Sequence, residues 1–252
     1  MDTFDHPLEV RLMRSLGLPF LLLIEEVTLV DRYRWVRDHL LGGPLRTLDA
    51  GCGLGLMVLA AAQKDREVVG ISYDDRENRH AAYRAELMGI HNVRFVTGDL
   101  RKLDAMELGS YDQVICAETI EHILDDEKLV RDLAQRLKVG GRLLLTTPFK
   151  GAYEGEKLSE QEDGGHVRPG YTREELQRLF ARNGLRLLSC DFISGRASRA
   201  VQRVRQRLSD RLNPSAAAYA TAPLKVLCIL DPLLTRARGR PYLSIAVIAQ
   251  RT

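Results

Sequence analysis

Residues 48–55 read LDAGCGLG and connect a strand-like apolar run to a helix-like segment. Gly51 and Gly53 let the backbone turn tightly and let a ligand approach it with no Cβ in the way. The first N–H groups of the following helix then face that ligand. The spacing GxGxG differs from the GxGxxG of a dinucleotide-binding loop, and an acid, Asp49, stands just before it. We expect a ligand-binding βα turn here, although a tight turn without a ligand would use the same glycines.

Strand-like and helix-like segments alternate around this loop, which is typical of a parallel sheet covered by helices. The expected strands are residues 45–50, 67–72, 93–97, 113–117, 142–147, 185–192 and 243–249. The expected helices are residues 54–64, 76–88, 126–138 and 172–183. The last of them begins with a capping-box pattern, residues 172–175 (TREE), and ends at Asn183-Gly184, a left-handed stop. These patterns divide the chain into an N-terminal helical cap, residues 1–44, and a main α/β domain, residues 45–252, with a helical insertion at residues 194–240.

Length and composition predict one ordinary globular domain. The chain has 252 residues, of which 45% are hydrophobic and 28% charged, with a formal net charge of +3. Only 6% of the residues are aromatic, and no basic stretch is interleaved with aromatic residues, so we expect no nucleic-acid partner. The four cysteines are widely spaced, which argues against a thiolate zinc site and a disulfide framework. The acidic N-terminus and the lack of an apolar run of about 20 residues favour a cytoplasmic protein.

Residues 45–193 and 243–249 resemble the class I S-adenosylmethionine-dependent methyltransferases of the type 11 and type 12 kind. The similarity lies in the glycine loop, in residues 98–100 (GDL), in residues 111–116 (YDQVIC) and in residues 140–145 (GGRLLL), in the family's order. This resemblance implies a Rossmann-like, seven-stranded, mostly parallel sheet with its last strand antiparallel and helices on both faces. It also implies S-adenosylmethionine as the cofactor.

The resemblance assigns residues to that cofactor. Asp49 would meet the amino group, and Asp99 would accept from the exocyclic amine of adenine. The full set of cofactor-binding candidates is Asp49, Ala50, Gly51, Cys52, Gly53, Ser72, Tyr73, Asp99, Leu100 and Glu118. One position departs from the family, which usually ends its second strand with an acid that binds the ribose. Here Ser72 takes that place, so either Ser72 bonds one hydroxyl or Asp74 or Asp75 reaches back.

Acids and imidazoles follow the fourth expected strand. Glu118, Glu121 and His122 are spaced i, i+3 and i+4 and would share a face if a helical turn began there. His166 follows in the Gly-rich loop of residues 149–171. Such oxygen and nitrogen donors suit a divalent cation. The pattern is similar to the metal site of the Hen-type small-RNA 2′-O-methyltransferases and the ubiquinone-biosynthesis O-methyltransferases. That similarity implies Mg²⁺, Mn²⁺ or Zn²⁺ held by Glu118, Glu121, His122 and His166.

These observations predict methylation of a hydroxyl on a small or lipid-like molecule, with His122, His166 and Glu121 as catalytic residues. A cation would lower the pKa of a bound hydroxyl and fix its oxygen near the methyl group. Tyr153 is a weaker candidate for acceptor contact. Two alternatives remain open. One is a metal-free N- or C-methyltransferase with His122 or His166 as base. The other is a non-catalytic scaffold that binds S-adenosylmethionine.

The insertion carries a basic helical pattern. Arg199, Arg203, Arg207 and Arg211 recur every four residues, opposite an apolar stripe. This helix either rests on anionic lipid or packs on the domain with its arginines in solvent. We therefore expect peripheral membrane contact through residues 196–234 as one interpretation. The sequence does not determine the oligomeric state.

Overall fold

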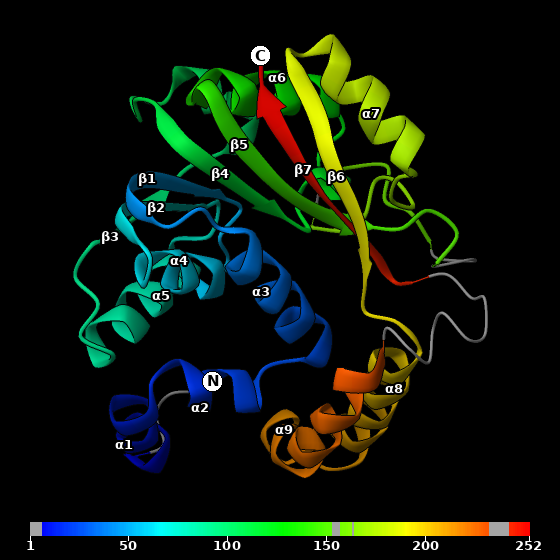
Figure 1. Ribbon diagram of the computed structural model, residues 1–252. Coiled ribbons are helices and arrows are strands. Elements are labelled where there is room, and N and C mark those ends of the chain that lie inside the picture. The colour runs from blue at the N-terminus through cyan, green and yellow to red at the C-terminus, as the bar shows by residue number, and fades with distance from the viewer. Residues whose placement is uncertain (1–6, 153–156, 163, 232–241) are drawn as a thin grey trace.

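The computed structural model describes residues 7–152, 157–162, 164–231 and 242–252 and has one seven-stranded sheet at its centre (Figure 1). The strands are β1 (Gly43–Ala50), β2 (Asp65–Ser72), β3 (Val93–Thr97), β4 (Tyr111–Ala117), β5 (Leu137–Pro148), β6 (Leu185–Ile193) and β7 (Ser244–Arg251). Their order across the sheet is β3-β2-β1-β4-β5-β7-β6. β1 to β5 pair in parallel, whereas β7 runs antiparallel to both β5 and β6. The predicted Rossmann-like fold, with its antiparallel last strand, is confirmed.

Helices cover both faces of the sheet, which explains why its central strands are largely buried in their C-terminal halves. One hydrophobic cluster joins the sheet to α3 (Val27–His39), α4 (Leu56–Ala62) and α5 (Asp75–Leu87). A second cluster joins the opposite face to η1 (Leu100–Ala105), α6 (Asp126–Arg136) and α7 (Arg173–Arg182). The parallel strands thus all end at one edge, where loops carry the candidate site residues.

The start of α7 shows how local sequence sets these elements. The Thr172 side chain accepts from the backbone N–H of Glu175, and the Glu175 carboxylate accepts from the N–H of Thr172. This capping box satisfies two N–H groups that the first helical turn leaves without partners. Gly184, at φ +69°, follows the helix end. Both features were predicted from the sequence and are confirmed.

Further helices lie outside the layer formed by α3, α4 and α5 (Figure 1). They are α1 (Pro7–Leu16), α2 (Leu18–Ile24), α8 (Arg196–Arg211), α9 (Pro214–Thr221) and η3 (Ala222–Leu230), and together we call them the cap. Buried residues of α1 and α2, such as Met13 and Leu21, belong to the same hydrophobic cluster as that layer. Lys225 of η3 donates to the backbone oxygens of Leu22, Leu23 and Glu25 at the end of α2. Burial lowers the pKa of Lys225 to about 8. The Lys225 side chain therefore joins the insertion after β6 to the N-terminal helices.

The first 44 residues make contacts in two directions. α3 packs on the sheet, where Trp35 and Val36 are buried in the same cluster as α4. Its N-terminal residue Val27 contacts the cap residues Val201 and Cys228 instead. α3 therefore connects the cap to the sheet. Among the described helices, none combines the length and the apolar character needed to cross a bilayer.

Candidate active site

The glycine loop is held in place by the neighbouring strand. The backbone N–H groups of Gly51 and Cys52 donate to the carbonyl oxygen of Ile71 at 2.9 and 2.8 Å. Gly51 has φ +90°, and a Cβ on it would lie 2.2 Å from Oγ1 of Thr119. Both the left-handed backbone and the close approach require glycine at this position. Glycine therefore lets the loop pack closely against Thr119 in the segment that follows β4.

A pocket of about 460 Å³ opens at the carboxyl ends of β1, β2, β3 and β4. Its size is within the range of small-molecule sites. It is lined by Gly51, Gly53, Ser72, Tyr73, Glu77, Gly98, Asp99, Leu100, Arg101, Glu118, Thr119, His122, Ile123, Glu162 and Gly164. Most of the predicted cofactor residues therefore share one pocket, although they come from four different loops.

Asp49, Ala50 and Cys52 are buried and do not line this pocket. Asp49 is only 1% exposed, and neither carboxylate oxygen has a hydrogen-bond partner among the described residues. Burial raises the pKa of Asp49 to about 7. A buried carboxylate without a partner is costly, and a ligand ammonium group would remove that cost. Burial also raises the pKa of the Cys52 thiol, which stays neutral.

The mouth of the pocket carries a chain of charged side chains. Asp99 accepts from the backbone N–H of Arg101 at 3.0 Å and from its guanidinium, which lowers the pKa of Asp99. Arg101 also pairs with Glu162 of the loop after β5 at 2.8 Å, and its guanidinium lies 6.0 Å from the ring centre of Tyr73. Tyr73 is 74% exposed. This chain ties the loop after β5 to the predicted adenine side of the pocket.

Of the three residues expected near the ribose at the end of β2, Asp74 and Asp75 are bonded to other residues. Asp74 caps α5 and pairs with Arg76, while Asp75 accepts from Thr97 and pairs with Arg79. Neither aspartate lines the pocket, and both carboxylates are bonded to other residues. Ser72 does line it, and so does Glu77.

The sequence reasoning missed Glu77. An acid in the first turn of the helix after β2 was the available signal.

Glu118 lies at the far end of the pocket from Tyr73. Its φ of +49° is unusual for a residue with a side chain. Oε2 of Glu118 is 3.3 Å from Nη1 of Arg32 in α3. The only helical turn here, η2 (Ile120–His122), begins after Glu118. The expected helical face shared by Glu118, Glu121 and His122 is therefore wrong, because Glu118 precedes the turn.

Glu121, His122 and His166 do come together, with one potential ligand atom of each within 4.8 Å of the others. Glu121 is fully buried, and its Oε2 accepts from Thr147 at 3.1 Å. Oε1 has no hydrogen-bond partner within the described part of the chain. Burial, together with the charge of Glu118, raises the pKa of Glu121. A cation bound here would offset both effects.

The orientation of His122 is set by the loop that carries His166. Nδ1 of His122 lies 3.0 Å from the carbonyl oxygen of Gly165. A carbonyl can only accept, so Nδ1 carries the proton and Nε2 keeps its lone pair for a ligand. The two imidazole rings are 4.8 Å apart at 63°. The donor set thus fits a divalent cation in residue type and tautomer. Tyr153, the weaker candidate for acceptor contact, lies outside the described residues.

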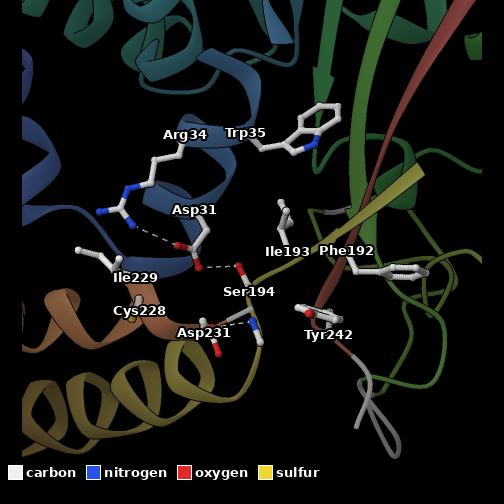
Figure 2. Close-up of a pocket in the computed structure, with 11 residues that line it drawn as sticks. Asp31, Arg34, Trp35, Phe192, Ile193, Ser194, Cys228, Ile229, Asp231 and Tyr242 are labelled. Atoms are coloured by element: carbon white, nitrogen blue, oxygen red, sulfur yellow. Dashed lines mark hydrogen bonds and ion pairs between the residues drawn. The ribbon is translucent and has the colours of Figure 1, made fainter. Parts of the chain in front are cut away.

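A second cavity, of about 470 Å³, lies between α3, the end of β6 and η3 (Figure 2). Trp35, Phe192 and Tyr242 form aromatic walls around it. Its two acids are already bonded, because Asp31 accepts from the hydroxyls of two serines and Asp231 from backbone N–H groups at the start of α8. Asp31 thus joins the start of α8 to α3, and Asp231 joins it to the end of η3. The rest of the lining that the structure describes is largely apolar, and Arg34 adds a positive charge to it.

Residues 27–190 match the sequence profile of a family described as "Methyltransferase domain". A ubiquinone biosynthesis O-methyltransferase of Xanthomonas axonopodis pv. citri is 29% identical over 201 residues, which cover 76% of this chain and 82% of that protein. Three further relatives of the same name align over 48–50% of their own length. For these relatives, the chain spans about half of the protein it matches.

Solved structures show the same fold at low identity. The (4+2)-cyclase SpnF superposes with a TM-score of 0.61 and 19% identity, covering 87% of this chain and 79% of that chain. Geranyl diphosphate C-methyltransferase from Streptomyces coelicolor A3(2) gives a TM-score of 0.59 and 20% identity, with 88% and 80% covered. Because one fold supports such different reactions, the chemistry has to be argued from the site.

Proposed function

Because the chain belongs to the methyltransferase domain family and has the fold of the class I S-adenosylmethionine-dependent methyltransferases, we propose that it methylates a hydroxyl oxygen of a small or lipid-like molecule. The reaction passes the methyl group of S-adenosylmethionine to that oxygen and leaves S-adenosylhomocysteine and a proton. O-methylation is the activity named for the relatives at 27–33% identity.

One observation carries this proposal: the Asp49 carboxylate, which has no hydrogen-bond partner among the described residues, is buried next to a glycine loop whose pocket extends to the His122 side chain. In the proposed complex, Asp49 binds the amino group of the cofactor, and Gly51 and Gly53 follow its amino-acid part. Asp99 and Leu100 bind the adenine of the cofactor. Ala50 and Cys52 are buried beneath the loop and hold its position. Ser72, Tyr73 and Glu118 line the rest of the cofactor pocket. The methyl group then lies toward the acid and imidazole cluster.

We propose that Glu121, His122 and His166 hold a divalent cation, either Mg²⁺, Mn²⁺ or Zn²⁺. When bound, such an ion lowers the pKa of a coordinated hydroxyl and so makes its oxygen a better nucleophile. Thr147 and Gly165 orient two of the donors through the hydrogen bonds described above. Glu118 completes this end of the site as a further candidate ligand, once its ion pair with Arg32 is broken.

Chelation tests this proposal. An alkyl-substituted catechol serves as the acceptor, and S-adenosylhomocysteine is quantified by mass spectrometry. We expect product formation in Mg²⁺ or Mn²⁺, loss of at least about 10²-fold in excess EDTA, and recovery when metal is added back, because a protonated hydroxyl is a poor nucleophile. Full activity in EDTA would instead favour metal-free transfer with His122 or His166 as base.

The acceptor is proposed to lie under the cap and to have an apolar part. The second cavity supports this, since its aromatic walls suit an apolar group and its acids Asp31 and Asp231 already accept hydrogen bonds from the start of α8 (Figure 2). We propose that the cap, formed by the N-terminal helices and the insertion after β6, works with the main domain to enclose this molecule. The part of the insertion at residues 232–240 lies outside the described residues.

A lipid-like acceptor is consistent with peripheral membrane contact through residues 196–231 of the described chain. α8 carries six arginines and one acid. Arg203, Arg207 and Arg211 on it are exposed. On the adjacent η3, Val226 is 66% and Ile229 65% exposed. Exposed apolar side chains beside a basic helix favour an anionic lipid surface.

Flotation with lipid vesicles measures this contact. We expect the protein to float with phosphatidylglycerol vesicles and to stay behind with phosphatidylcholine vesicles. Replacing Arg203, Arg207 and Arg211 by glutamine should reduce the floated fraction several-fold, because each basic residue near an anionic surface contributes about 1 kcal/mol.

The matched control replaces three other exposed arginines by glutamine, namely Arg76 and Arg79 on α5 and Arg182 on α7. This control should change the floated fraction little. Equal flotation with both lipids, or none with either, would contradict this part of the proposal.

A further inference from the structure

A carboxylate that the strand pattern does not predict lies in the middle of the cofactor pocket. Glu77 stands in the first turn of α5, and its Oε2 accepts from the hydroxyl of Ser72 at 2.5 Å. Both residues line the pocket. Ser72 is itself fixed, because its carbonyl oxygen accepts from the backbone N–H of Gly98 at 3.0 Å and from the side chain of Asn78 at 3.3 Å. The carboxylate is therefore held at the end of β2.

The position of this pair within the pocket is informative. The glycine loop lies on one side of it, after β1, and Asp99 lies on the other side, after β3. β2 lies between β1 and β3 in the sheet, so Ser72 and Glu77 stand between the two ends of the pocket. Under the proposed function, the amino-acid part of the cofactor is at one end and adenine at the other. The sugar that joins them has to cross this middle position.

The other acids near the end of β2 are engaged elsewhere. Asp74 uses its carboxylate to cap α5 and to pair with Arg76. Asp75 is bonded to Thr97 and Arg79 and does not line the pocket. Glu77 is therefore the acid that this stretch offers to a ligand in the pocket. A negative charge is also favoured in the first turn of a helix, which makes this a stable place for it.

We propose that Glu77, positioned by Ser72, binds the ribose hydroxyls of the cofactor, so that the sugar-binding acid is supplied by α5 instead of by the last residue of β2. A carboxylate accepts hydrogen bonds at two oxygens and so matches two adjacent hydroxyls. Ser72 holds the carboxylate in place and leaves the second oxygen toward the ligand. This assignment rests on the proposed function, because it takes S-adenosylmethionine as the ligand.

Calorimetry with two compounds tests the assignment: S-adenosylhomocysteine and its 2′,3′-dideoxy analogue. The wild type should prefer the hydroxylated compound by about 10- to 100-fold, the range expected for hydrogen bonds to a charged group. In Glu77→Gln this preference should fall to a few-fold or less. Because the readout is a ratio within one protein, a general loss of stability does not imitate it. Glu86→Gln, an exposed acid farther along α5, should keep the wild-type ratio.

A second variant moves the acid back to the strand. In the double substitution Ser72→Asp with Glu77→Gln, a carboxylate again stands at the pocket but on β2. We expect it to regain at least about 10-fold of the preference lost in Glu77→Gln. An unchanged ratio in Glu77→Gln would overturn the assignment while leaving the proposed function intact. A wild type that binds neither compound would contradict the proposed function itself.

Discussion

Replacing Gly51 by alanine should abolish detectable binding of S-adenosylhomocysteine, with affinity falling by roughly 100-fold or more. The new Cβ would lie 2.2 Å from Oγ1 and 2.8 Å from Cγ2 of Thr119. Thr119 cannot rotate away freely, because its hydroxyl donates to the carbonyl oxygen of Ala117. The left-handed backbone at φ +90° adds about 1–2 kcal/mol of strain for a residue with a side chain. The loop must therefore move, and the pocket with it.

Two further variants separate the collision from the strain. Gly89→Ala also places a side chain at positive φ, +67°, but no described atom lies within 4 Å of its Cβ. It should lower stability by about 1 kcal/mol through strain and leave binding unchanged. Thr119→Ala in the Gly51→Ala background removes the two closest atoms and should restore part of the binding. Thermal unfolding and calorimetry measure both effects. Wild-type affinity in Gly51→Ala would show that this loop does not contact the ligand.

Glu121→Gln should separate metal binding from stability. We expect Mn²⁺ affinity, measured by calorimetry, to fall by at least about 100-fold, because a ligand carboxylate is lost. Methyl transfer to the catechol should fall by about 10²- to 10⁴-fold. The metal-free protein should nevertheless unfold at or above the wild-type temperature. Burial and the neighbouring Glu118 raise the pKa of Glu121, so its charged form is unfavourable without a cation, and a neutral amide of the same shape removes that cost.

Glu160→Gln provides the control for this experiment, since Glu160 is an exposed carboxylate in the loop that also carries His166. It should leave Mn²⁺ affinity, activity and unfolding temperature unchanged. If Glu121→Gln binds Mn²⁺ as the wild type does, the acid and imidazole cluster is not a metal site. If it unfolds at a much lower temperature without metal, the Thr147 hydrogen bond would outweigh the cost of the buried charge.

The sequence predicted most of the fold because local patterns carry that information. The alternation of strand and helix periods predicted the parallel sheet, and the capping-box spacing of Thr172 and Glu175 predicted the start of α7. It failed where one backbone conformation redirects a side chain. Glu118 matches the helical spacing to Glu121 and His122, but its φ of +49° places it before the turn and toward Arg32. No periodicity in the chain encodes that dihedral angle.

The end of β2 is a second place where the local sequence did not identify the residue that lines the pocket. Ser72 in place of an acid was visible in the sequence, but the substitute was sought in Asp74 and Asp75. Asp74 and Asp75 are nearer to Ser72 along the chain. Glu77 is one helical turn after Asp74, and its side chain reaches Ser72 because α5 packs beside β2 and β3. Which acid of a helix start faces a pocket depends on how the helix is rotated, and packing sets that rotation.

By itself the sequence determined the order of the strands and helices, the glycine loop and the residue types of the acid and imidazole cluster, since these follow from short-range period and turn chemistry. Only the tertiary structure brought His122 to Gly165, 43 residues away, and Arg32 to Glu118. Only the tertiary structure buried both carboxylate oxygens of Asp49 where no described residue bonds to them. Contacts between distant segments depend on how helices and loops pack on the sheet, and no local stretch of the chain specifies that packing.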